Sequence, residues 1–304
     1  MNVLILGAGA IGGYYGSRLI DAGAQVTFLL RPKRARELAE HGLRVIRANG
    51  EFSAPIRTIT SVTGADQYDL VLLSCKAFDL DDAIAAITPA VGDTTCVLPL
   101  LNGMRHLDVL DAEFGADRVL GGLCHISVTL EADGSIRQFA PLDRLTFGAR
   151  SSTTALAPIA KVLRATSIEL VESDDIVGAM WSKFALITTL AGITSFMRGS
   201  IGEINATAEG VALSRRLYRK CAQVAARSGH PIPAATLAEA DRILSTPGSP
   251  LKASMLRDIE RGAATECEHI LGDMLGRANA HGIESPLLAA ACTHVRVYEA
   301  ARAT

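Results

Sequence analysis

The sequence lacks several features that would point to particular classes of protein. Thirty lysine and arginine residues nearly balance 32 aspartate and glutamate residues, for a formal charge of −2, and no basic block occurs. A nucleic-acid-binding surface is therefore not expected. The six cysteines are widely spaced without a C-x-x-C pair, so neither a zinc knuckle nor a thioredoxin-type motif is predicted, and no metal site. Buried, reduced thiols are the remaining expectation.

Long hydrophobic runs are also scarce. The first, Val3–Leu6, has no charged region before it and breaks at Gly7, unlike a signal peptide, so we expect a cytoplasmic protein. The second, at 176–197, is long enough to span a membrane, but it contains Lys183, serine, threonine and glycine, and no further span accompanies it. A buried core helix of a soluble domain, with no membrane partner, is the better prediction.

The N-terminal stretch is the most informative part of the chain. An apolar strand pattern runs into a glycine turn and then into a helical pattern, which is typical of a dinucleotide-binding unit. The first glycine makes the tight turn, the second lets a pyrophosphate approach the backbone, and the third lets helix and strand pack closely. The helix N-terminus then offers N–H groups to the phosphates. The turn reads Gly7-Ala8-Gly9-Ala10-Ile11-Gly12.

The next predicted strand, 25–30, ends at Arg31. A carboxylate at this position would bind the ribose 2′-OH of NAD, whereas an arginine accommodates the 2′-phosphate of NADP. No acid lies between Asp21 and Glu37 to repel a phosphate. The residues thus favour NADP(H), although Arg31 could instead simply open a solvated helix.

Further elements predict an α/β fold, a doubly wound parallel sheet followed by an all-α domain. Lys76 and Asn102 each follow a predicted buried strand, where a doubly wound sheet binds its ligands, although a loop lysine and an Asn-Gly turn are the plain alternatives. We place a Rossmann-type domain at 1–172 and a helical domain at 173–304. The patterns predict an extended hairpin at 43–59, a strand at 118–121, a short antiparallel edge of the same sheet at 123–148, and helices at 203–228 and 254–281.

The helical domain contains candidate catalytic residues. An unpaired lysine on a buried helix would have a lowered pKa, so Lys183 either reaches solvent or has a carboxylate partner. In a dry pocket it could act as a general acid. Ser254 and Glu266 lie twelve residues apart, so an unbroken helix would put them on roughly one face, where Glu266 could support Lys183. A helix cap and a surface glutamate are the plain alternatives.

These motifs in this order resemble the ketopantoate reductase (2-dehydropantoate 2-reductase) family over nearly the whole chain. They are Gly7-x-Gly9-x-x-Gly12, Arg31, Lys76, Leu-Asn102-Gly103, Trp181-x-Lys183-Phe, Ser254-Met-Leu-x-Asp-Ile and Thr265-Glu266.

The resemblance implies NADPH-dependent reduction of a 2-oxo acid, with 2-dehydropantoate and pantothenate biosynthesis as the first expectation. It implies that Lys183 is the general acid and that Glu266 supports it. Asn102 and Ser254 would contact substrate or nicotinamide, and Arg31 with Lys76 would hold the cofactor. A small-molecule substrate and a homodimer formed through the helical domain are the expected partners.

The chain also departs from the family pattern. Family members typically carry asparagines one and two turns after the helix lysine, where this sequence has Ile187 and Ala191, and the tandem serines are reduced to Ala253-Ser254. Loss of hydrogen bonds to a hydroxy acid weakens discrimination. Three alternatives stay open: a reductase for another 2-oxo acid, a β-hydroxyacid or opine-type dehydrogenase, and a non-catalytic NADP(H) sensor.

Overall fold

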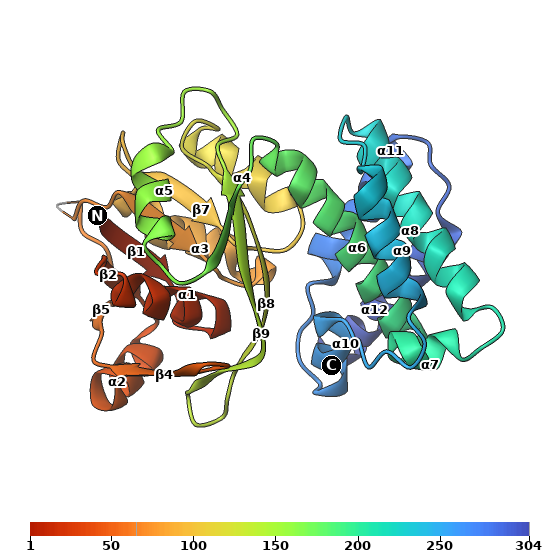
Figure 1. Cartoon of the computed structure of the whole chain (residues 1–304), viewed down its shortest axis with the longest axis horizontal. Coiled ribbons are helices and arrows are strands. Elements are labelled where there is room, and N and C mark those ends of the chain that lie inside the picture. The colour runs from red at the N-terminus through yellow and green to blue at the C-terminus, as the bar shows by residue number, and fades with distance from the viewer. Residues whose placement is uncertain (65, 304) are drawn as a thin grey trace. The chain divides into compact units, whose positions relative to one another are not determined.

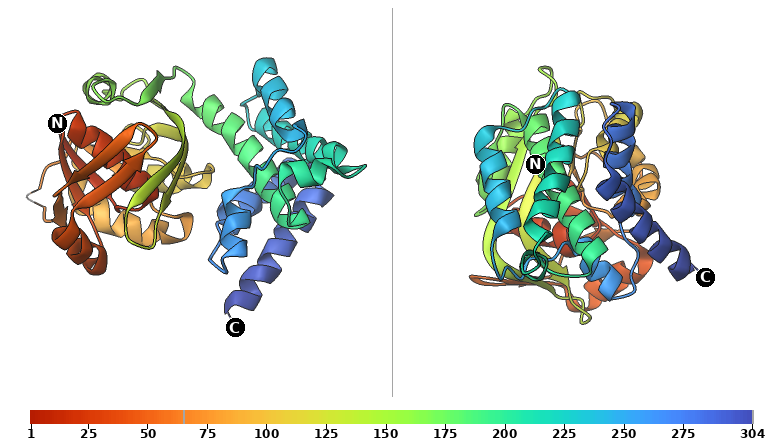
Figure 2. Two further views of the ribbon diagram at one scale, coloured as in Figure 1. Left: turned by 60° about the horizontal axis from the view of Figure 1, so that its bottom comes forward. Right: turned by 90° about the vertical axis from the view of Figure 1, so that its right-hand side faces the viewer.

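The computed structural model describes every residue except Ala65 and Thr304. The chain forms two compact units. The first comprises Met1–Leu101 and His106–Ile176, and the second comprises the short segment Asn102–Arg105 together with the chain from Val177 onward. The first unit contains the strands, whereas the second is built of helices (Figures 1 and 2).

A parallel five-stranded sheet forms the centre of the first unit. Its strand order is β5-β2-β1-β6-β7, so the connections reverse direction between β1 and β6. The carboxyl ends of the strands on both sides of such a reversal border a ligand-binding crevice. The strands are β1 (Asn2–Leu6), β2 (Gln25–Leu29), β5 (Arg57–Ile59), β6 (Leu70–Leu73) and β7 (Cys96–Pro99).

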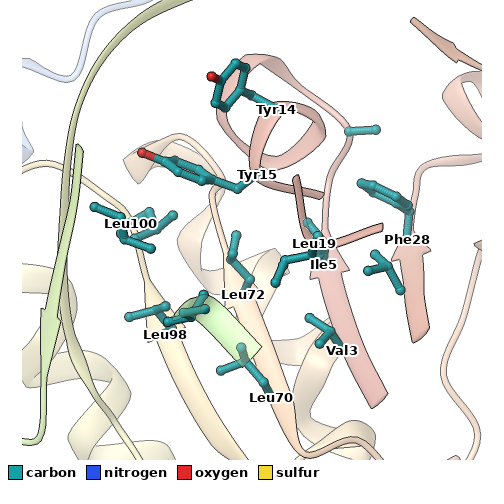
Figure 3. Packing of buried hydrophobic residues seen from close by; sticks show 14 of the residues in the cluster. Val3, Ile5, Tyr14, Tyr15, Leu19, Phe28, Leu70, Leu72, Leu98 and Leu100 are labelled. Carbon is teal, nitrogen blue, oxygen red and sulfur yellow. The ribbon is translucent and has the colours of Figure 1, made fainter. Parts of the chain in front are cut away.

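Helices cover this sheet because its strands are apolar on both faces. All four residues of β6 and of β7 are buried. Figure 3 shows Leu72 of β6 and Leu98 of β7 directed toward the same layer as Tyr15 of helix α1. The helices of the first unit are α1 (Ala10–Asp21), α2 (Pro32–His41), α3 (Leu80–Ile87), α4 (Arg105–Phe114) and α5 (Ala157–Arg164), with 3₁₀ turns at Ala77–Asp79 and Thr88–Ala90.

A second sheet lies in the same unit, and it corrects the sequence-based expectation. The antiparallel pair expected to close the parallel sheet instead joins the hairpin β3–β4, because β3 pairs in parallel with β9. The strand expected at 118–121 is also wrong: only Val119 forms an isolated bridge, to Val97, and β8 begins at Gly121. The strands are β3 (Leu43–Arg47), β4 (Gly50–Ala54), β8 (Gly121–Leu130), β9 (Ile136–Gly148) and β10 (Glu169–Glu172).

The second unit is all-α, as predicted, and α6 (Ile176–Met197) is its longest helix. Among the described residues α6 alone is long and apolar enough to cross a membrane, but 56% of its most apolar window is buried inside the protein. The other helices are α7 (Ile201–Asn205), α8 (Gly210–Arg227), α9 (Ala234–Ser245), α10 (Ser254–Glu260), a π-helical segment (Glu268–Gly272), α11 (Asp273–Ala280) and α12 (Pro286–Ala303).

Two expected long helices are broken. The one expected at 203–228 is divided into α7 and α8, and a Cβ atom on Gly210 would lie 1.8 Å from the carbonyl oxygen of Ile204, so only glycine permits the turn between them. The one expected at 254–281 ends at Glu260, and Gly262 follows with φ +68. All six cysteines are free thiols and five of them are buried, in line with the expectation from their spacing.

Candidate active site

The glycine turn sits at the carboxyl end of β1. Gly7 has φ +86, a conformation that glycine adopts without strain, and its N–H donates to the carbonyl oxygen of Leu29 at 3.0 Å. Gly9 is the N-cap of α1 and has no side chain to cap the helix. The first backbone bond of the helix runs from the N–H of Gly13 to the carbonyl of Gly9, so the N–H groups of Ala10, Ile11 and Gly12 have no partner within the helix.

The third glycine is fixed by packing. A Cβ atom on Gly12 would lie 2.4 Å from the carbonyl oxygen of Gly7 and 2.5 Å from Oγ of Ser74. Two further glycines of α1, which the motif did not single out, are equally tight: a Cβ on Gly13 would lie 2.3 Å from Cδ1 of Ile136, and one on Gly16 would lie 2.3 Å from Cζ of Phe28. The helix can approach the sheets only with glycine on this face.

The geometry of the turn suits the pyrophosphate of a dinucleotide. A Cβ on Gly7 or Gly9 would meet no atom within 4 Å, so there is open space beside the backbone at both residues. The unpaired N–H groups and the positive end of the helix dipole favour an anion there. Gly7, Gly9, Ala10, Ile11 and Gly12 can thus hold the phosphates of the cofactor expected from the sequence.

Arg31 and Lys76 lie beyond the carboxyl ends of β2 and β6, and both side chains are exposed. Arg31 is the N-cap of α2, and its Nη2 donates to Oδ1 of Asp79 at 2.7 Å. The sequence has no acid between Asp21 and Glu37, but the fold brings Asp79 to Arg31 from 48 positions further along the chain. This hydrogen bond is the main reason that the pKa of Arg31 is raised.

Arg34 contributes to the turn in a way that the sequence did not reveal. Its Nη2 donates to the carbonyl oxygen of Ala8 at 3.3 Å and to that of Gly134 at 2.9 Å. The side chain is 17% exposed, and its Nε is buried without a hydrogen-bond partner. Of the cations near the start of α2, Arg34 is thus the one bonded to the glycine turn, whereas Lys33 and Arg36 are exposed.

In the second unit, Lys183 is half-buried on α6, two residues after Trp181. The Trp181 ring is 3% exposed and stacks on His230 with ring centroids 5.9 Å apart, and the Arg277 guanidinium lies 5.3 Å from its centroid. These contacts fix the turn of α6 that carries Lys183. The partner expected for Lys183 stays a prediction.

The segment Asn102–Arg105 is held in this unit by His269. The His269 side chain hydrogen-bonds to the backbone of Asn102, and a Cβ on Gly103 would lie 2.9 Å from Cδ2 of His269. Burial lowers the pKa of His269, and Glu266 acts on the same ring electrostatically. His269, which no sequence pattern indicated, is therefore bonded to the backbone of one predicted site residue, Asn102, and interacts electrostatically with another, Glu266.

Glu266 is positioned by a non-helical segment. Glu299 of α12 accepts a hydrogen bond from the N–H of Thr265 at 2.7 Å, and the hydroxyl of Tyr298 donates to the carbonyl of Ala263 at 2.8 Å. Ser254 lies exposed at the start of α10, which ends at Glu260. The expectation that Ser254 and Glu266 share one helix face is therefore wrong, since no continuous helix joins them, and since twelve residues on an unbroken helix would leave the two side chains roughly 120° apart.

Comparison with known proteins covers both units. Residues 3–152 match the family model "Ketopantoate reductase PanE/ApbA", and residues 175–299 match its C-terminal counterpart. The chain is 32% identical over 302 residues to the uncharacterized oxidoreductase YkpB of Bacillus subtilis, with 99% of each chain covered.

Two further relatives have more specific descriptions. A 2-dehydropantoate 2-reductase of Mesorhizobium japonicum is 26% identical, covering 91% of this chain and 92% of its own. The crystal structure of a PanE/ApbA family ketopantoate reductase from Ralstonia eutropha is 26% identical, superimposes with a TM-score of 0.90 and covers 100% of both chains. The similarity therefore extends over the dinucleotide-binding unit and the helical unit alike.

Proposed function

The chain belongs to the ketopantoate reductase family, and from that premise we propose which substrate it reduces and which residues act. The family consists of NADP-dependent oxidoreductases that act on a CH–OH group and reduce a 2-oxo acid, so the protein is such an enzyme with NADP(H) as its cofactor. The finer proposal is that 2-dehydropantoate is the substrate and pantoate the product, a step of pantothenate biosynthesis.

The open glycine turn and Lys183, the single charged residue of α6, support reduction of a carbonyl with NADPH, and the choice of 2-dehydropantoate rests on similarity to relatives described as 2-dehydropantoate 2-reductases. Bound NADPH supplies the hydride that reduces the carbonyl carbon of the substrate. We propose that Lys183, in its protonated form, donates a proton to the carbonyl oxygen. A nearby carboxylate keeps a half-buried lysine protonated, and Glu266 takes that role in our proposal.

Roles for the remaining residues follow from the groups they offer. The Asn102 amide can donate to and accept from the substrate or the nicotinamide, and the Ser254 hydroxyl can bind the substrate carboxylate. Gly7 to Gly12 would hold the pyrophosphate, and Arg31 with Lys76 would hold the adenosine ribose and its 2′-phosphate.

The catalytic role of Lys183 is tested by Lys183→Ala. Loss of a general acid typically costs about 10²- to 10⁴-fold, so kcat should fall by that order while the Kd for NADPH stays within about twofold. Lys220→Ala removes a half-buried lysine from α8 in the same unit and serves as the matched control. Near-normal turnover by Lys183→Ala would contradict the assignment, whatever the substrate.

A second candidate function is reduction of a 2-oxo acid with a more apolar tail. Ile187 and Ala191 follow Lys183 by one and two turns of α6, so all three lie along one face of the helix. Ala191 is buried and Ile187 half-buried, and neither can hydrogen-bond a hydroxyl through its side chain. This substitution favours an apolar substrate over the hydroxylated 2-dehydropantoate.

A substrate screen separates these candidates. NADPH oxidation is followed with 2-dehydropantoate and with 2-oxo acids that carry aliphatic or aromatic tails, and kcat/KM is compared. The highest value with 2-dehydropantoate supports the first proposal, and the highest value with an apolar 2-oxo acid supports the second. Tight NADPH binding, with no oxidation of NADPH by any of these 2-oxo acids, would favour a non-catalytic NADP(H) sensor.

The protein is soluble, as its family is, and we propose that it acts in the cytoplasm. The homodimer expected from the sequence stays a prediction, which a measurement of mass in solution tests.

A further inference from the structure

The ion pair between Arg31 and Asp79 places two opposing determinants of cofactor choice in one contact. Arg31 stands at the end of β2, where a dinucleotide-binding unit meets the adenosine ribose. An arginine there accommodates the 2′-phosphate of NADP, whereas a carboxylate accepts a hydrogen bond from the 2′-OH of NAD. Nη2 of Arg31 lies 2.7 Å from Oδ1 of Asp79, so the carboxylate lies at the same end of β2 where Arg31 would meet the adenosine ribose.

The side chain of Asp79 binds Arg31 and does not cap the N-terminus of helix α3. It is the N-cap residue of α3, yet its side chain makes no cap hydrogen bond. Its N–H donates to the carbonyl oxygen of Lys76 at 2.9 Å in the 3₁₀ turn after β6, which fixes its backbone. The Asp79 side chain is 32% exposed and the Arg31 side chain 75% exposed, so solvent and a ligand can reach the pair.

The electrostatics oppose a doubly charged phosphate. Besides Asp79, the carboxylate of Asp82 in the first turn of α3 acts on Arg31 through its charge. A 2′-phosphate must therefore compete with Asp79 for the guanidinium and approach a carboxylate of like charge. A ribose 2′-OH meets neither obstacle and offers Asp79 a donor.

We propose that Asp79 is a specificity-determining residue that limits the preference of this enzyme for NADPH over NADH. The carboxylate engages Arg31 when no 2′-phosphate is present, and it can accept the ribose 2′-OH of NADH. The inference rests on the proposed role of Arg31 at the adenosine ribose. NADPH remains the cofactor, but NADH should support measurable turnover.

The test uses two nucleotides that differ only in the phosphate in question. Kd values are measured by calorimetry for adenosine 2′,5′-bisphosphate and for adenosine 5′-monophosphate, and kcat/KM for NADPH and NADH is measured alongside. The variants are Asp79→Asn, which keeps an acceptor for Arg31 but removes the charge, and Arg31→Ala. Asp81→Asn is the matched control, because it removes a neighbouring exposed carboxylate that is not bonded to Arg31.

Asp79→Asn should raise the preference for the 2′-phosphorylated nucleotide about five- to tenfold, the size expected for one partly exposed charge pair. Asp81→Asn should change it less than about twofold because solvent screens a more distant charge. Arg31→Ala should lower it. A preference left unchanged or lowered by Asp79→Asn, or one matched by Asp81→Asn, would overturn the proposal for Asp79. If Arg31→Ala also leaves the preference unchanged, the role of Arg31 itself is wrong.

Discussion

Two glycine-to-alanine substitutions three residues apart should separate cofactor binding from folding. In Gly9→Ala the new methyl group meets no atom within 4 Å, and φ at this residue is −76, which alanine adopts readily. In Gly12→Ala the methyl group would lie 2.4 Å from the carbonyl oxygen of Gly7. An ordinary contact of this kind is about 3.5 Å, so backbone atoms must move by roughly 1 Å.

The magnitudes follow from these two environments. Gly9→Ala should leave the free energy of unfolding unchanged or raise it by up to about 1 kcal/mol, because alanine restricts the unfolded chain. Gly12→Ala gains about 1 kcal/mol of helix propensity but pays up to about 3 kcal/mol for overpacking, for a net loss of about 1–2 kcal/mol. Both variants should bind NADPH at least tenfold more weakly, which is a loss of about 1.4 kcal/mol of binding free energy. In Gly9→Ala the reason is that the methyl group would occupy the space through which the pyrophosphate approaches the backbone.

The assay is urea unfolding without cofactor, paired with a fluorescence titration of NADPH on the folded proteins. The distinguishing result is Gly9→Ala with full stability and weakened NADPH binding. If Gly9→Ala binds NADPH as tightly as the unaltered chain, the pyrophosphate does not approach this turn. If Gly12→Ala loses no stability, the close packing of α1 on β1 is wrong.

Two other predictions concern residues that only the structure revealed. Arg34→Met should weaken NADPH binding about fivefold at nearly constant kcat, because it removes the hydrogen-bond donor to the carbonyl oxygen of Ala8 in the glycine turn. Arg36→Met, at an exposed position, is the control in the same titration of NADPH. Because burial lowers the pKa of His269, the unfolded chain binds a proton that the folded chain does not in the pH range between this lowered pKa and about 6.5. The free energy of unfolding should therefore decrease as the pH is lowered through this range, by at most about 1.4 kcal/mol per pH unit. Urea unfolding of His269→Gln should show a smaller decrease, since the nearby Glu266, Asp273 and Arg105 remain in both proteins. Equal pH slopes would refute this.

Local patterns predicted the elements whose cause is local. The strand, turn and helix at the N-terminus depend on consecutive residues, and α6 has the bounds that its apolar run indicated. The break after Glu260 was not predicted because helical periodicity continues past it, although part of its cause is local: Gly262 has φ +68, and the N–H of Ala263 donates to the carbonyl of Asp258 at 2.8 Å, as at a glycine-capped helix end. Contacts from α12 to Ala263 and Thr265 hold the intervening segment out of the helix, and those contacts join residues more than 30 positions apart.

Sheet membership was likewise beyond local pattern. The alternation in 123–148 correctly indicated antiparallel strands, but which strand they would join depends on pairing energies between distant segments. β9 pairs in parallel with β3, with Val45 opposite Ile136, and this pairing forms the second sheet.

The sequence by itself determined the glycine turn, the arginine at the end of the second strand and the lysine in a long apolar helix, because each is written in adjacent residues or a regular period. Only the tertiary structure decided what surrounds them. Asp79 beside Arg31, Arg34 on the carbonyl of Ala8, and His269 on the backbone of Asn102 all result from packing that brings distant segments together. Hydrogen bonds act over about 3 Å in space and are blind to sequence separation, so chemistry set by such neighbours has no signature in the order of the residues.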